Sequence, residues 1–200
     1  MESVNTQIQQ VPKYDKTDDT IVFGFWVYLM TDCVLFAALF AVYAVLHNNT
    51  FGGPDGAQIF SPPYILVETI ALLTSSFTCG IGLISAYNMQ KNRVIGWFSV
   101  TFLLGLSFVV MEVMEFSHLI RSGDSFKRSA FLSSYFTLVG THGLHVTVGL
   151  IGMLILIIRI YTKGLTKASV RRLTLLSLFW HFLDIIWIFI FTIVYMLGFS

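Results

Sequence analysis

Five long apolar stretches dominate this chain, and their interiors carry acids and histidines but neither lysine nor arginine. The stretches cover residues 21–47, 64–88, 94–119, 131–160 and 173–197. Each is longer than the roughly 20 residues that an α-helix needs to cross about 30 Å of hydrocarbon. Backbone amides in lipid must be satisfied within their own segment, so the stretches predict helices and not open strands. We therefore expect an all-α membrane protein, a bundle of five transmembrane helices.

The composition agrees with this class. Hydrophobic residues make up 56% of the chain and charged residues only 12%, whereas a soluble domain carries about 25% charged residues. A formal net charge of +1 gives no indication of nucleic-acid binding. Cys33 and Cys79 both fall inside apolar stretches, where they read as small buried residues and not as a disulfide or metal pair. We expect a polar tail over 1–20 and one transmembrane domain over 21–200.

The basic residues predict the orientation of the helices. With five crossings, nine of the twelve lysines and arginines lie on the side of the N-terminus, and three lie on the other side. Cytoplasmic loops carry the excess of Lys and Arg. The N-terminus is therefore predicted in the cytoplasm and the C-terminus in the periplasm, with the glycine-rich loop 48–63 facing outward.

Five acids and four histidines inside the apolar stretches are the candidate polar groups: Asp32, Glu68, Glu112, Glu115, Asp184, His118, His142, His145 and His181. An ionised acid near the centre of a bilayer costs about 2.5–3.5 kcal/mol on insertion scales. No stretch interior offers a lysine or arginine as a partner. Each acid must therefore be protonated, be paired with a histidine, or lie near a helix end that water reaches.

Their spacing indicates stripes that face other helices or a partner. Glu112, Glu115 and His118 follow one another at three-residue intervals, which predicts a shared helix face. His142 and His145 are three residues apart, and so are His181 and Asp184. Glu68 and the Glu112–His118 stripe are expected nearer the outer surface, and Asp32 with the remaining polar groups nearer the middle of the membrane.

Three interpretations of these stripes stay open at this point. Glu115-x-x-His118 matches the motif of di-iron helical bundles, although that motif normally occurs twice. His142 or His145 together with His181 could supply two axial haem ligands. The third interpretation, favoured for most of these groups, is hydrogen bonding between helices, worth about 0.6–2 kcal/mol each in membranes. Asp32 is the exception, because it is deep and its own helix offers no obvious partner.

Three segments resemble a known family. They are GFWVYLMTDCVLF at 24–36, THGLHV at 141–146 and FWHFLDIIW at 179–187. Together they resemble subunit III of the haem–copper terminal oxidases, most closely that of the bo-type ubiquinol oxidases. The resemblance covers 22–198 and matches the short, five-helix form of the family.

The resemblance implies a non-catalytic core subunit of a proton-pumping oxidase in the respiratory chain of a bacterial inner membrane. Such a subunit packs on subunit I, which carries the haem and copper, and has subunit II and a small subunit IV as further partners. It binds phospholipid and supports assembly, turnover and proton uptake, with no catalytic residue, metal or redox centre of its own. Subunit III of a cytochrome c oxidase is the alternative, and a small proton channel or a membrane metalloenzyme is less favoured.

The resemblance also implies roles for individual residues. Asp32 matches the family's buried carboxyl near the lipid cleft, a position that is usually Glu in cytochrome c oxidases. Glu68 matches an acid early in the next helix, and Glu115 with its neighbours matches an acidic run in the third. His145 and the His181–Asp184 pair match structural positions that tie the fourth and fifth helices together.

Overall fold

The computed structural model describes residues 16–47, 49, 62–122 and 129–196. Five long helices account for nearly all of them: α1 (Lys16–Leu46), α3 (Pro62–Tyr87), α4 (Lys91–Arg121), α5 (Ala130–Lys163) and α6 (Lys167–Ile190), the last continued by a π-helix, η1 (Phe191–Met196). All five are long and apolar enough to cross a membrane. Within the described residues there is no strand, so the predicted all-α membrane fold with five spans is confirmed.

The helices extend beyond the apolar stretches that predicted them. α1 begins at Lys16, inside the predicted polar tail, and α5 continues to Lys163. A helix can continue past the hydrocarbon because its backbone bonds are local and need no apolar side chains. Capping then sets some of the ends: the Ser129 hydroxyl accepts from the Leu132 N–H, and the Thr166 hydroxyl accepts from the Ser169 N–H. Residues 1–15 and most of the predicted outward loop lie outside the described residues.

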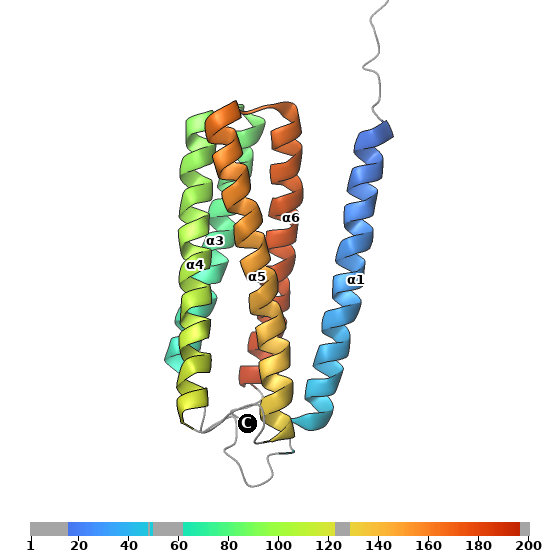
Figure 1. The fold of residues 1–200 in the computed structure, drawn as a ribbon, viewed down its shortest axis with the longest axis vertical. Helices are drawn as coiled ribbons and strands as arrows, with labels where there is room; N and C mark the ends of the chain where they lie inside the picture. The colour runs from blue at the N-terminus through green and yellow to red at the C-terminus, as the bar shows by residue number, and fades with distance from the viewer. Residues whose placement is uncertain (1–15, 48, 50–61, 123–128, 197–200) are drawn as a thin grey trace, which may run out of the picture.

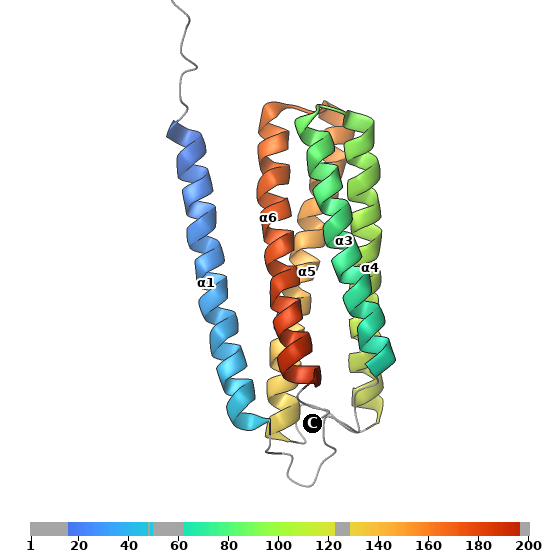
Figure 2. The same cartoon turned by 180° about the vertical axis from the view of Figure 1, so that it is seen from behind.

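Four of the helices form a compact bundle, and α1 lies to one side of it. α3 packs against α4 and α6, and α5 packs against α4 and α6. α1 contacts α5 and, less extensively, α6 (Figures 1 and 2). It makes this contact through Leu29, Phe36 and Tyr43, which are buried and recur every seven residues. A seven-residue period keeps one stripe of a helix against its neighbour, so the other faces of α1 stay exposed.

Two tryptophans on α6 fill the centre of the bundle and anchor it to α3. Trp180 and Trp187 are 1% and 0% exposed. The Trp180 indole N–H donates to the Ser75 hydroxyl at 3.0 Å, and the Trp187 indole N–H donates to the Thr69 hydroxyl at 3.1 Å. A buried indole needs such an acceptor. The two pairs therefore hold α6 in one register against α3.

Candidate functional site

Eight of the nine predicted polar residues are buried or partly buried, and they separate into distinct groups. Asp32 and His145 form a pair between α1 and α5. Glu68, Glu112 and Glu115 form an acidic group in α3 and α4. His181 and Asp184 on α6 lie beside Ser76 of α3. His142 lies apart from all three groups, among aromatic rings.

The Asp32–His145 pair supplies the partner that the sequence did not reveal. Asp32 is 6% exposed, and its Oδ1 atom lies 3.7 Å from His145 Nε2. His145 Nδ1 lies 2.8 Å from the Thr141 carbonyl oxygen. A carbonyl oxygen only accepts, so Nδ1 carries a hydrogen, and Nε2 is the ring nitrogen that faces Asp32. His145 therefore faces α1, whereas the resemblance had linked it to the last helix.

The acidic group is connected to α5 and η1 through two tyrosines. Glu68 is fully buried and Glu112 is 4% exposed, and Glu68 interacts electrostatically with both Glu115 and Glu112. The Tyr135 hydroxyl donates to Glu115 Oε1 at 3.3 Å and lies 3.1 Å from the Tyr195 hydroxyl. Four segments of the chain thus meet at this group.

His118 does not join Glu112 and Glu115 on one face. Its side chain is exposed, whereas Glu112 is buried. Each three-residue step falls about 60° short of a full turn, so two steps rotate the side chain by about 120°. The predicted shared face therefore reaches from Glu112 to Glu115 and ends there.

His142 is a packing residue in this fold. It is 0% exposed, stacks on Trp187 with ring centroids 5.3 Å apart, and meets the edge of Phe108 at 6.0 Å. Neither ring nitrogen has a hydrogen-bond partner among the described residues. Three residues of the His-Gly-Leu-His segment thus have different surroundings: His142 packs against rings, Gly143 lies against Glu112, and His145 faces α1.

The third group lies where α3 and α6 meet. The Ser76 hydroxyl is hydrogen-bonded to His181 Nδ1 at 2.5 Å. Asp184 Oδ2 lies 3.8 Å from the same nitrogen, beyond hydrogen-bond range, and the Asp184 side chain is buried. The His181 side chain is 43% exposed. The pair therefore ties α6 to α3 through Ser76, which the sequence did not identify as a partner of His181.

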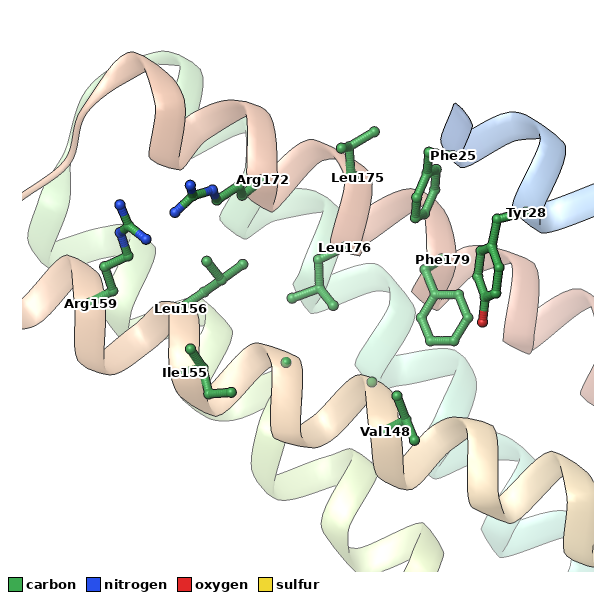
Figure 3. A pocket seen from close by; sticks show the side chains of 12 residues that line it. Phe25, Tyr28, Val148, Ile155, Leu156, Arg159, Arg172, Leu175, Leu176 and Phe179 are labelled. Atoms are coloured by element: carbon green, nitrogen blue, oxygen red, sulfur yellow. The ribbon is translucent and has the colours of Figure 1, made fainter. Parts of the chain in front are cut away.

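A cleft of 480 Å³ opens between α1, α5 and α6 (Figure 3). Its walls are apolar for most of their length, with Phe25 and Tyr28 from α1 and Phe179 from α6 at one end. At the other end the side chains of Arg159 and Arg172 point toward one another from α5 and α6. In the sequence, both arginines served only to predict the orientation of the helices in the membrane. Their position at facing ends of consecutive helices was the signal that could have identified them.

The described residues contain no group of three or more His, Cys, Asp or Glu side chains that could hold a metal ion. His142, His145 and His181 face three different neighbourhoods, and the His118 side chain is exposed. The di-iron and haem interpretations of the stripes therefore find no converging set of ligands in this part of the chain.

The family model for cytochrome c oxidase subunit III matches residues 11–199. The chain belongs to this family. The fold, the Asp32 motif and the two histidine motifs are thus those of a subunit III of the haem–copper oxidases, and the resemblance drawn from the sequence is confirmed. As such, the protein is a membrane-spanning subunit of a multi-subunit respiratory oxidase.

Individual relatives cover nearly the whole subunit III. This chain is 59% identical over 177 residues to cytochrome bo(3) ubiquinol oxidase subunit 3 of Pseudomonas aeruginosa, and the match covers 88% of this chain and 85% of the relative. It is 54% identical to the protein of the same name from Pseudomonas putida, covering 88% and 86%. Cytochrome c oxidase subunit 3 of Bacillus sp. PS3 is 42% identical, covering 88% and 84%.

Proposed function

We propose that this subunit III serves a terminal oxidase of the bacterial inner membrane that oxidises ubiquinol. The observation that carries the proposal is the 59% identity, over 88% of the chain, to a subunit named for ubiquinol oxidase. The relative named for cytochrome c oxidase is 42% identical over the same share of the chain. The chain contributes helices and polar contacts to the complex, and the redox centres belong to its partner.

The main partner in this proposal is subunit I, which holds the haem and copper, with subunit II and a small subunit IV nearby. Large exposed apolar side chains on every helix support contact with lipid and with neighbouring helices. Lys91, Arg93 and the basic residues of 159–172 lie at the same end of the bundle as the start of α1, as Figure 1 shows for the helix ends. This distribution supports an N-terminus in the cytoplasm.

The cleft between α1, α5 and α6 supports phospholipid binding. An acyl chain fits apolar walls such as those formed by Val148, Ile155 and Leu176. A phosphate group fits the end where Arg159 and Arg172 converge, because guanidinium groups bind phosphate through paired N–H donors. The basic end lies on the proposed cytoplasmic side, where the headgroups of the inner leaflet are found.

Asp32 is the residue that this proposal connects with proton uptake and sustained turnover. It is a buried carboxyl one helical turn from Tyr28, which lines the cleft. His145 lies beside it and can exchange the role of acceptor for that of donor. The pair thus offers a protonatable site beside lipid, close to the expected flank of subunit I.

Purification through an affinity tag on this chain tests the proposal. The expected product contains a haem–copper subunit, visible as a haem spectrum, and consumes oxygen with a short-chain ubiquinol but not with reduced cytochrome c. Consumption with reduced cytochrome c alone would assign the chain to the alternative oxidase. A tagged chain that brings down no haem protein would contradict both assignments.

A further inference from the structure

An exposed histidine in the middle of a membrane span points to a surface that a neighbour covers. His181 is the fifteenth of 29 residues in the span Lys167–Tyr195, and Ser76 is the fourteenth of 25 in Pro63–Tyr87. The His181 side chain is nevertheless 43% exposed. Titratable side chains within membranes almost always face a bundle interior, a partner or water, because contact with hydrocarbon is costly.

The imidazole has a fixed orientation and a free nitrogen. Its Nδ1 is hydrogen-bonded to the Ser76 hydroxyl, and Asp184 lies on the same side of the ring. Among the described residues no hydrogen bond to Nε2 is found. The α3–α6 contact therefore holds the ring in place while leaving one polar atom available.

The surface next to this ring is shaped for a helix. A groove of 460 Å³ runs along α3 and is lined by Leu73, Ser76, Phe77, Gly80, Ile81, Ile84 and His181. Ser76 and Gly80 are four residues apart, the small-xxx-small spacing that lets two membrane helices approach closely. A Cβ atom built on Gly80 meets nothing within 4 Å, so the space in front of it is open. Figure 2 shows α3 and α6 side by side, with α6 between α1 and α3.

We propose that the Ser76–Gly80–His181 groove is the docking surface for one transmembrane helix of a neighbouring oxidase subunit. That helix presents a hydrogen-bonding side chain to His181 Nε2 at mid-membrane depth and packs its backbone against Gly80. The chemistry of the groove favours a helix over a lipid, because an acyl chain has no group that can satisfy the imidazole. The inference rests on the proposed function in one respect, namely that the chain works within a multi-subunit oxidase.

Paired glycine substitutions test the groove. Gly80→Leu fills it, and Gly96→Leu is the matched control, because Gly96 on α4 likewise has nothing within 4 Å of its Cβ position. Both variants should reach the membrane in normal amounts. In the purified oxidase, the ratio of the other subunits to this chain should fall for Gly80→Leu and stay at the wild-type value for Gly96→Leu. Equal retention in the two variants would overturn the proposal.

Substitutions of His181 test whether its imidazole hydrogen-bonds to the neighbouring helix. His181→Phe should weaken association with the neighbour by about three- to tenfold, the range expected for one hydrogen bond between membrane helices. His181→Gln should restore most of it, because an amide keeps a donor and an acceptor. If His181→Phe retains the other subunits as well as the wild type, the imidazole makes no such contact.

A photo-crosslinking residue in place of Phe77, which is 69% exposed within the groove, identifies the occupant. In the intact oxidase the expected adduct joins this chain to another subunit of the same complex. Adducts with lipid alone would overturn the proposal. A wild-type chain that never co-purifies with a haem protein would instead refute the proposed function, so the two failures are distinguishable.

Discussion

The carboxyl group of Glu112 on α4 lies directly against the backbone of Gly143 on α5. A Cβ atom added to Gly143 would be 2.5 Å from Oε1 and 2.6 Å from Oε2 of Glu112. Real Cβ contacts do not come this close, so the glycine of the His-Gly-Leu-His segment makes room for the acid on the next helix. The two helices can approach one another here because residue 143 has no side chain.

Gly143→Ala should therefore destabilise the α4–α5 contact. The added methyl must displace a buried carboxyl, and overpacking of this kind costs about 1–3 kcal/mol. Gly140→Ala, one turn earlier on α5, is the control, since its Cβ would meet only Phe116 at an ordinary 3.5 Å. Thermal denaturation of the purified complex should show a lower midpoint for Gly143→Ala alone. Similar midpoints for the two variants would show that Glu112 moves aside without cost.

Asp32→Asn should leave assembly nearly intact. The Asn amide has the same size and shape as the Asp carboxyl and keeps a hydrogen-bonding group beside His145 Nε2. The wild-type protein should react with a hydrophobic carbodiimide at this position, and Asp32→Asn should not; peptide mapping of the labelled subunit measures both. Failure of Asp32→Asn to assemble would contradict this expectation and show that the carboxyl group itself is required.

Ser75→Ala should loosen α6 from α3. The Ser75 hydroxyl donates to the Leu72 carbonyl and accepts from the Trp180 indole N–H, so its removal leaves a buried donor unpaired. The expected loss in the free energy of unfolding is about 1–3 kcal/mol. Thr74→Ala, the neighbouring hydroxyl on the exposed side of the same helix, should change it little. Denaturation midpoints that fall equally for both variants would contradict this role of the Trp180 contact.

The double variant Arg159→Gln/Arg172→Gln should retain less phospholipid than the wild type. Both guanidinium groups point into one end of the cleft, and hydrogen bonds to a charged group are worth about 1.5–3 kcal/mol each. Loss of either should weaken retention at least about tenfold. Native mass spectrometry counts the bound lipids, and Arg121→Gln, at the opposite end of the bundle, serves as the control. Unchanged lipid occupancy in the double variant would exclude this end of the cleft as a phosphate site.

Several elements of the fold followed from local sequence alone. The apolar stretches predicted the five spans, because length and hydropathy are properties of one segment and need no knowledge of its neighbours. The helix ends were less accurate, since α1 begins at Lys16 and not at residue 21. Hydropathy marks where lipid ends, whereas a helix ends where its caps and loops lie.

The sequence predicted which acids and histidines form the candidate site, but not which of them contact one another. The acids and histidines were identified because charged groups in apolar stretches are costly. His118 was grouped with Glu112 and is in fact exposed, since a three-residue spacing drifts around the helix. Ser76, Arg159 and Arg172 were not recognised as site residues. A serine or a terminal arginine is unremarkable in a span until the facing residue is known.

The sequence by itself determined the class of this protein: five membrane-spanning helices of the cytochrome c oxidase subunit III family, with acids and histidines that must be shielded from lipid. Only the tertiary structure decided which of those groups meet. His145 faces Asp32, and His181 binds Ser76 across 105 residues of chain. Periodicity reports which side of a helix is polar, but the partner of each polar atom depends on how separate helices are rotated and arranged around one another.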